Sequence, residues 1–157
     1  MAEKTAAVGS KVPDFTLPST GGKPWKLAEA SGRNVVLYFY PKDNTSGCTR
    51  EGQQFSELHA GFRKAKTVVL GVSPDSLAMH DKFKAKFDFP FDLLSDETQK
   101  ACALFGVWKE KSMYGRKYMG VERSTFLIDA QGILRQEWRK VKVDGHAAEV
   151  LAAAREL

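Results

Sequence analysis

The chain has 157 residues, two cysteines and a formal net charge of +5 at pH 7. This length suits one domain with an ordinary buried core, and we expect residues 1–157 to form it. The two cysteines, Cys48 and Cys102, are too few for a disulfide-rich secreted scaffold. The first residues lack the apolar core of a signal peptide, and no apolar run is long enough to span a bilayer. We therefore expect a cytoplasmic protein that does not enter membranes.

Basic residues are interleaved with acidic ones along most of the chain. Even the densest basic stretch, residues 135–142, is interrupted by Glu137. This arrangement is typical of a solvated surface rather than of a stripe that binds nucleic acid. We expect no nucleic-acid partner.

Runs of apolar, β-branched and aromatic residues predict the strands of a central sheet. These runs span residues 35–40, 67–72, 125–128 and 133–138, and residues 91–94 are predicted to be a short extended piece. An N-terminal hairpin is predicted over 14–17 and 25–27. Residues 107–120 are charged and punctuated by glycines, and we interpret them as a loop that ends in a late strand.

Apolar residues at helical spacing predict helices between these strands. The first predicted helix carries Cys48 in its first turn and runs to about Phe62. The second begins near Ser76. Its apolar face is formed by residues four apart: Met79, Phe83 and Phe87.

Two more helices are predicted in the second half of the chain. One contains Cys102 and follows a cap at Ser95 or Asp96, and the last follows a cap at Asp144. The order of strands and helices predicts an α/β fold with a mixed central β-sheet flanked by helices.

Cys48 stands where a buried strand gives way to a helix. Pro41 ends the strand because it lacks a backbone N–H, and turn-forming residues follow as far as Gly47. The first turn of a helix has free N–H groups and the positive end of the dipole, which stabilise a thiolate over a thiol. Cys48 is therefore the candidate nucleophile. The alternative is a small buried hydrophobic residue.

Several separated segments resemble one family. Pro41, Thr45 and Cys48 match the Pro-x-x-x-Thr-x-x-Cys signature of the peroxiredoxins. Residues 122–129, which include Arg123, are similar to the arginine-bearing strand of that family, and residues 9–17 to its N-terminus. The resemblance is to the Q-type, or bacterioferritin comigratory, subfamily, and it implies a thioredoxin-like fold.

The resemblance also implies an activity. The protein would reduce hydrogen peroxide and organic hydroperoxides through a Cys48 sulfenic acid, without a cofactor. Arg123 would stabilise the thiolate and hydrogen-bond the peroxide, and the Thr45 hydroxyl would bond the attacked oxygen. The N–H groups of Gly47 and Cys48 would act like an oxyanion hole.

Two further residues would support this site. By the same resemblance, Pro41 would shield the thiolate from water, and Glu51 would orient Arg123. Simpler alternatives remain open for some residues. Arg123 can form a surface ion pair with Glu122, and Thr45 can serve only as a helix cap.

The second cysteine has no position that the Q-type pattern explains. Members of this subfamily place a resolving cysteine five residues after the reactive one or on the following helix, but this chain has Gln53 and Lys84 there. We therefore predict a one-cysteine mechanism with an inert Cys102. Alternatively Cys102 resolves Cys48 after local unfolding, or Cys48 is a non-enzymatic peroxide-sensing switch.

The expected partners follow from this interpretation. The reductant would be thioredoxin, glutaredoxin or a small thiol, and we expect a monomer. No metal is expected, because the histidines lack metal-ligand spacing with each other and with the cysteines: His59, His80 and His146.

Overall fold

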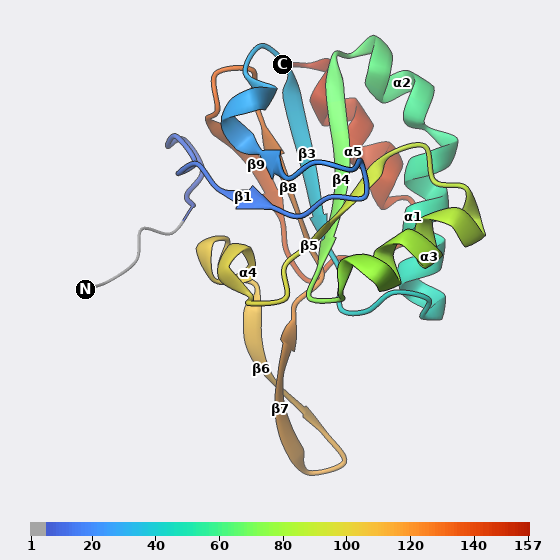
Figure 1. Cartoon of the computed structure of the whole chain (residues 1–157). Coiled ribbons are helices and arrows are strands. Elements are labelled where there is room, and N and C mark those ends of the chain that lie inside the picture. Colours follow the sequence, from blue (N-terminus) through green and yellow to red (C-terminus); the bar gives the residue numbers. More distant parts are fainter. Residues whose placement is uncertain (1–5) are drawn as a thin grey trace.

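The computed structural model describes residues 6–157, so the prediction about a signal core in residues 1–5 lies outside its range. At its centre is a five-stranded sheet in the order β5-β4-β3-β8-β9 (Figure 1). Within this sheet β3, β4 and β5 are parallel, whereas β8 and β9 are antiparallel to their neighbours. The strand bounds are Asn34–Phe39 for β3, Thr67–Ser73 for β4, Asp92–Ser95 for β5, Ser124–Ile128 for β8 and Leu134–Trp138 for β9. The prediction of a mixed central sheet is confirmed.

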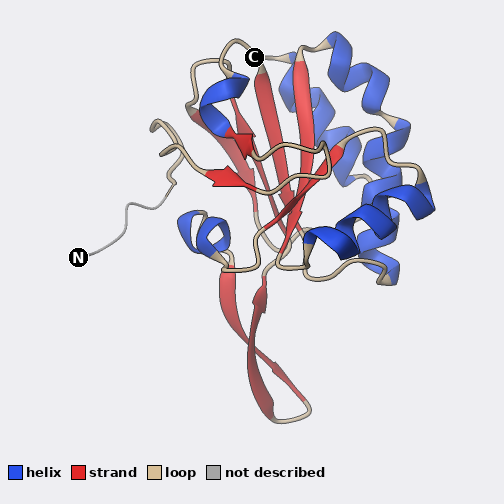
Figure 2. Ribbon diagram, viewed as in Figure 1, coloured by secondary structure: helices blue, strands red, loops and turns tan. Residues whose placement is uncertain are grey.

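Helices and a small hairpin cover the two faces of this sheet (Figure 2). One face packs against α1, α2, α3 and α5, which span Ser46–Glu57, His59–Lys64, Leu77–Phe87 and His146–Arg155. The other face packs against β1, β2, the 3₁₀ helix η1 and α4, which span Thr16–Leu17, Trp25–Lys26, Leu27–Ala30 and Lys100–Leu104. The predicted N-terminal hairpin, β1–β2, is confirmed. Among residues 6–157, no helix is both long and apolar enough to cross a bilayer.

Side chains of β3 alternate between two separate cores, because successive residues of a strand point to opposite faces. Leu37 and Phe39 lie in the core that contains Cys102. Val36 and Tyr38 lie in the core that contains Cys48. The two cysteines therefore lie on opposite faces of the central sheet.

The prediction for residues 107–120 is confirmed in its late strand and wrong in its loop, because residues 108–121 form a second hairpin of two strands. Strands β6 (Trp108–Met113) and β7 (Arg116–Val121) pair with each other and project beyond the sheet (Figure 1). Tyr114 and Gly115 form the turn with φ of 53° and 78°, as a two-residue turn of this kind requires. Both faces of the hairpin are mostly exposed, so the sequence lacks the apolar alternation that indicates a strand.

Three helix predictions need correction. The helix that carries Cys48 ends at Glu57, and α2 begins at His59 after a break at Leu58. On α3 the buried side chains are His80 and Phe83, whereas Met79 is 42% exposed. Helix α5 has no side-chain cap, because the carboxylate of Asp144 pairs instead with Arg50 on α1.

The predicted cap of the helix around Cys102 is confirmed at one of its two candidates. The carboxylate of Asp96 accepts hydrogen bonds from the N–H groups of Ala101 and Cys102, at 3.1 and 2.8 Å. These are orphan donors of the first turn of α4. Asp96 therefore anchors the helix that holds the second cysteine.

Gly52 fixes how closely α1 approaches the aromatic core. A Cβ at this position would lie 2.5 Å from Cζ of Phe89. Phe89 cannot retreat easily, since its buried ring stacks on Phe91 and meets Phe83 edge-on. We therefore expect Gly52→Ala to destabilise the fold by about 1–3 kcal/mol in urea unfolding, although alanine favours helix by about 1 kcal/mol.

The matched control is Gln53→Ala, which changes the exposed neighbour on the same helix. Its free energy of unfolding should stay within about 0.5 kcal/mol of the parent. Equal stability of the Gly52→Ala variant and the parent would show that the aromatic core yields to the added methyl group.

Candidate active site around Cys48

Cys48 is the third residue of α1 and lies just beyond the carboxyl end of β3. Its side chain is 2% exposed and belongs to the core formed with Tyr38 and Tyr40. The helix ladder begins with the N–H of Thr49, which bonds the Thr45 carbonyl at 2.9 Å. The earlier N–H groups, including those of Gly47 and Cys48, therefore have no acceptor one turn back in the helix. The predicted place of Cys48 in the first helical turn is confirmed.

Arg123 reaches Cys48 from a distant part of the sequence. Strand β8 begins one residue after Arg123, and its Ser124 pairs with Phe39 at the end of β3. This antiparallel register sets the arginine beside the start of α1. Its Nη2 donates to Cys48 Sγ at 3.3 Å, and its Nη1 donates to Glu51 Oε1 at 2.6 Å.

The alternative reading of Arg123 as a partner of Glu122 at the surface is wrong. The ion pair of Arg123 is with Glu51, and the arginine side chain is only 18% exposed. Burial by itself would lower the pKa of Arg123, but the negative charges of Glu51 and Cys48 outweigh it and raise the pKa above its usual value. The guanidinium is therefore a permanent cation between two acidic groups.

Glu51 is a buried acid with one unpaired oxygen. It is 1% exposed, and its Oε2 has no hydrogen-bond partner among residues 6–157. Burial raises the pKa of Glu51 to about 7, while the contact with Arg123 acts in the opposite direction. Its charge therefore changes near neutral pH, directly behind the arginine that contacts Cys48.

Glycine at position 47 leaves room for the arginine. A Cβ at Gly47 would lie 3.3 Å from Nη2 of Arg123, closer than ordinary van der Waals contact. The guanidinium thus crosses over the first turn of α1. The absence of a side chain at Gly47 therefore matters to the site, in addition to the backbone N–H of this residue.

Thr45 and Pro41 lie at the exposed edge of this site. The Thr45 hydroxyl donates to the Lys42 carbonyl at 2.9 Å, and it makes no side-chain cap for α1. Thr45 is the N-cap residue of α1, as predicted, although its side chain makes no cap hydrogen bond. Pro41 directly follows β3, as the strand-ending role requires. Its shielding of the sulfur stays a prediction.

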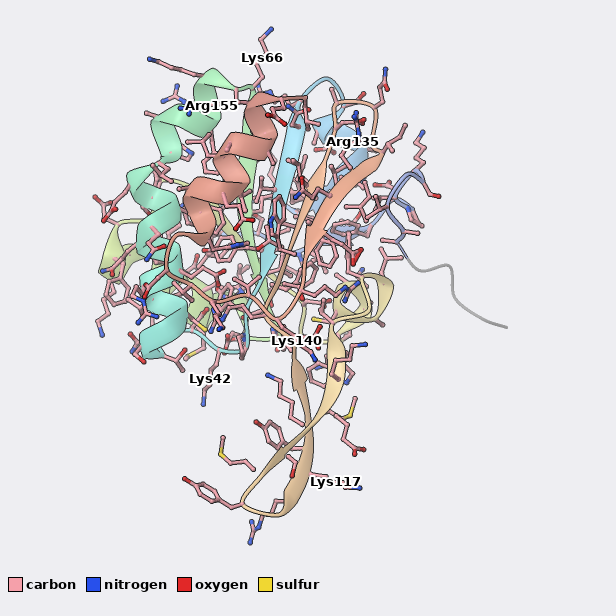
Figure 3. The ribbon with its side chains drawn as sticks, turned by 180° about the vertical axis from the view of Figure 1, so that it is seen from behind. Lys42, Lys66, Lys117, Arg135, Lys140 and Arg155 are labelled. Atoms are coloured by element: carbon pink, nitrogen blue, oxygen red, sulfur yellow. The ribbon has the colours of Figure 1, made fainter. Side chains whose placement is uncertain are left out.

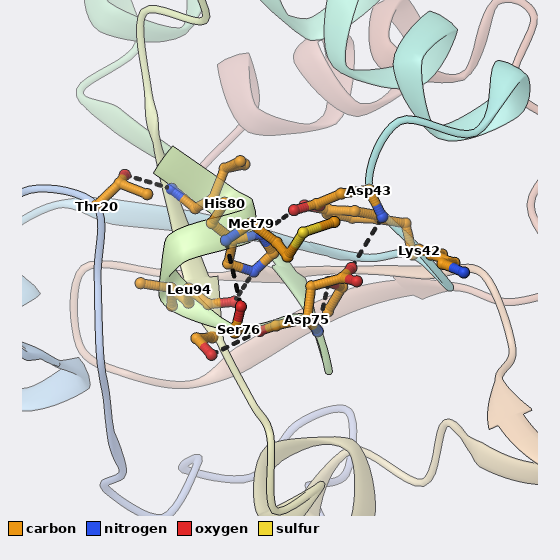
Figure 4. A network of polar contacts seen from close by, with 12 residues as sticks. Thr20, Lys42, Asp43, Asp75, Ser76, Met79, His80 and Leu94 are labelled. Atoms are coloured by element: carbon orange, nitrogen blue, oxygen red, sulfur yellow. Dashed lines mark hydrogen bonds and ion pairs between the residues drawn. The ribbon is translucent and has the colours of Figure 1, made fainter. Parts of the chain in front are cut away.

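A buried polar network holds the loop before Cys48, and the sequence did not reveal it (Figure 4). Asp43, in this loop, accepts a hydrogen bond from Tyr40 at 2.6 Å and lies 2.6 Å from Nδ1 of His80 on α3. Nε2 of His80 lies 2.9 Å from the Leu94 carbonyl, which can only accept, so Nε2 carries a proton. The Asp43 N–H donates to Asp75 at 2.8 Å. The loop is thus tied to β3, α3 and the segment between β4 and α3.

The helical spacing could have indicated that His80 is buried. His80 precedes the buried Phe83 by three positions and therefore shares its helix face. Its partner Asp43 is distant in sequence and shows no pattern. Among the described residues, Asp43, Asp75 and His80 also have acceptor atoms within 4.8 Å of one another, as a cation site requires. These atoms already bond one another or the backbone, so we assign the cluster to the hydrogen-bond network.

Cys102 is not brought to the active site. It is fully buried on α4, in the core on the other face of the sheet from Cys48. Burial, followed by the nearby Asp96 carboxylate, raises the pKa of the Cys102 thiol far above its usual range. A protonated, enclosed thiol is a poor nucleophile.

The buried acid gives stability a distinct pH dependence. Between about pH 4.5 and 7 the unfolded chain has lost the Glu51 proton while the folded chain keeps it, so folding takes up a proton. Raising the pH through this window should destabilise the parent relative to Glu51→Gln, by on the order of 3 kcal/mol in urea unfolding. Glu57→Gln, an exposed change on the same helix, should leave the pH profile unchanged. Parallel profiles for Glu51→Gln and the parent would contradict the buried-acid assignment.

Comparison with known proteins places this geometry in a family. The AhpC/TSA family profile matches residues 8–137. Peroxiredoxin Bcp of Bacillus subtilis is 48% identical over 153 residues, which cover 98% of each chain. Peroxiredoxin Bcp of Xanthomonas campestris is 51% identical over 140 residues, covering 89% of this chain and 88% of the relative.

Solved structures agree with the sequence relatives. A structure of Xanthomonas campestris peroxiredoxin Q superposes with a TM-score of 0.87 at 49% identity, covering 90% of each chain. A mutant of the Xylella fastidiosa protein PrxQ gives a TM-score of 0.91 at 40% identity over 98% of each chain. The thioredoxin-like fold is thereby confirmed. The chain belongs to the AhpC/TSA family, and within it to the peroxiredoxins of the Bcp, or Q, type.

Proposed function

We propose that the protein reduces hydrogen peroxide and organic hydroperoxides at Cys48, with Arg123, Thr45 and backbone N–H groups as the binding machinery. As a peroxiredoxin, it is a thiol-dependent peroxidase. The observation that carries the residue assignment is the 3.3 Å contact between Nη2 of Arg123 and Sγ of Cys48. Work on a Xanthomonas campestris relative, 45% identical to this chain, concerns alkyl peroxide reduction.

The proposed step transfers one oxygen atom to sulfur. The Cys48 thiolate attacks the terminal oxygen of ROOH, an S–O bond forms, and the O–O bond breaks. Cys48 becomes a sulfenic acid, and the leaving alkoxide takes a proton and departs as an alcohol, or as water from hydrogen peroxide. The sulfur loses two electrons and the peroxide gains them.

Ionising the thiol gives only part of the acceleration. An unperturbed thiol is already a few per cent thiolate at pH 7, so full ionisation gains on the order of 30-fold. Most of the effect must come from donors aimed at charge that moves onto the leaving oxygen. The guanidinium of Arg123 and the first-turn N–H groups of α1 would take this role, which the contact of Arg123 with Cys48 supports. The Thr45 hydroxyl, at the exposed edge of the site, would bond the attacked oxygen.

Regeneration of Cys48 requires a thiol from outside the chain. Cys102 is excluded from direct attack because the central sheet separates the two sulfurs. We therefore propose a one-cysteine cycle, with thioredoxin, glutaredoxin or a small thiol as reductant. A monomer in a reducing compartment, such as a cytoplasm, completes this proposal.

The test of the cysteine assignment is intact mass after one equivalent of peroxide, with a sulfenic-acid trap and a thiol-blocking reagent present. Because Cys102 is enclosed in the folded protein, the blocking reagent acts after unfolding in denaturant, and we expect one trap adduct on Cys48 and one blocked thiol on Cys102. Cys48→Ser should form no adduct and show no turnover, whereas Cys102→Ser should keep the parent's turnover with dithiothreitol. A loss of two hydrogens that joins the two cysteines would overturn the one-cysteine cycle.

The test of Arg123 is the rate constant for oxidation of Cys48 in stopped-flow mixing with peroxide. Arg123→Lys keeps the charge but loses the fork that contacts both Cys48 and Glu51. We expect the rate constant to fall about 100-fold, at the lower end of the effect of losing one transition-state donor. Arg135→Lys, which changes an exposed arginine paired with Asp129, is the control and should oxidise at the parent's rate. Parent-like oxidation of Arg123→Lys would remove the fork from the mechanism.

A further inference from the structure

The β6–β7 hairpin concentrates the exposed apolar side chains of the molecule. Seven large hydrophobic residues are exposed among residues 6–157, and four of them lie on this hairpin. These four are Met113, Tyr114, Tyr118 and Met119, with exposures of 55%, 98%, 44% and 48%. Clustered exposure of this kind marks an interaction site more often than scattered single residues do. An isolated two-stranded hairpin is also only marginally stable without packing, so a partner surface would stabilise it.

The two faces of the hairpin differ in charge. Paired residues share a face, and the register joins Lys111 to Tyr118 and Met113 to Arg116. We call the face that holds these four residues and Lys109 the cationic face, since it carries three basic side chains and no acid. On the opposite face Glu110 pairs with Lys117 at 3.7 Å, so its charges cancel. A partner for the cationic face must therefore be acidic.

The cationic face leads directly to the active site. Strand β7 ends at Val121, two residues before Arg123. Lys111 and Tyr118 fold over Gly120 near the base of the hairpin, where a Cβ would lie 3.3 Å from Cδ of Lys111. Burial and then the positive charge of Arg123 lower the pKa of Lys111, which places this lysine in the field of the site. A molecule bound along this face would lie beside Cys48.

The chemistry of Cys48 needs such a molecule. Cys48 is 2% exposed, and the only other cysteine in the chain lies in the opposite core. A protein thiol that is held at the site can attack an enclosed sulfur more efficiently than one that meets it only by random collision. A protein surface that recognises the hairpin would supply this holding.

We propose that the cationic face of the β6–β7 hairpin docks an acidic protein dithiol that reduces Cys48 sulfenic acid; this rests on the proposed function. One thiol of the partner attacks Cys48 sulfur, an S–S bond forms, and the sulfenic oxygen leaves as water. The partner's second thiol then attacks its own sulfur in this mixed disulfide. Cys48 leaves as a thiol, the partner becomes a disulfide, and its two electrons have reduced the sulfenic acid.

A second copy of this chain fits the surface poorly. Two cationic faces would bring three basic side chains of each copy together without an acid, and the whole chain carries +5. Like charges at an interface disfavour association. Lys42 and Lys140 also lie toward the hairpin end of the main body in Figure 3. The charge of this end of the molecule thus favours an acidic partner.

The experiment compares two reductants on one charge-reversal variant. Lys109→Glu with Arg116→Glu changes the outer part of the cationic face and leaves Cys48, Arg123 and Lys111 unchanged. Turnover is driven either by bacterial thioredoxin with its reductase and NADPH, or by dithiothreitol. We expect kcat/KM for thioredoxin to fall at least tenfold, as lost electrostatic steering predicts. Turnover with dithiothreitol and the rate of Cys48 oxidation should keep their parent values.

The matched control is Lys66→Glu with Arg155→Glu, which makes the same change of net charge at the other end of the molecule (Figure 3). Its kcat/KM for thioredoxin should match the parent. Tyr118→Ser tests the apolar part of the face and should raise the KM for thioredoxin alone.

Each other outcome has a defined meaning. Equal kcat/KM for the parent and the hairpin variant, or a parent that only dithiothreitol reduces, would overturn the docking proposal and leave the peroxidase proposal standing. A parent that neither reductant turns over would overturn the proposed function itself. Binding of the parent to phosphatidylglycerol vesicles that is lost in the hairpin variant, with unchanged thioredoxin kinetics, would reassign the face to a membrane surface.

Discussion

The site depends on the contact between Arg123 and Cys48, and the pairing of the central strands brings these two residues together. These residues are 75 positions apart in sequence, and they meet because β8 runs antiparallel to β3 and begins where β3 ends. The helix α1 starts at that same edge, so the free N–H groups of its first turn and the guanidinium both lie at the end of the helix that carries the sulfur. Glu51, one turn further along α1, holds the second prong of the arginine. A single pairing of strands thus assembles a cation, a helix terminus and a nucleophile.

The position of Cys48 could be predicted because it depends on local patterns. Proline after an apolar run, polar turn residues and then helical spacing act within about twenty residues, and such signals are read directly. Arg123 came only from the family resemblance, since its approach to Cys48 depends on the pairing of β3 and β8. The β6–β7 hairpin was missed because exposed strands need no apolar alternation. The Asp43–His80 pair was missed because two polar residues 37 positions apart leave no periodic signal.

The Asp43–His80 network shows how a loop beside a reactive sulfur is held without a regular element. Three side chains and a carbonyl satisfy one another in a region closed to water, with both Asp43 and His80 side chains fully buried. A satisfied pair of this kind adds little net stability, but removal of one partner leaves a buried polar group unpaired at a cost of about 3–5 kcal/mol. The main effect of the network is therefore to fix the conformation of the loop rather than to raise the free energy of unfolding. It defines the path by which the chain passes from β3 into α1.

The placement of the two cysteines on opposite faces of the sheet has a consequence for the life of each molecule. Under the proposed function, the oxidised sulfur has no internal thiol to convert it into a protected disulfide. Its persistence is then set by how often a reductant arrives, and a second peroxide competes for it during every cycle. Reaction with that peroxide gives the sulfinic and then the sulfonic acid, which ordinary thiols do not reverse. The fraction of active protein would therefore decline as the cumulative exposure to peroxide grows relative to the supply of reductant. The inactivated fraction would be a measure of past exposure to peroxide.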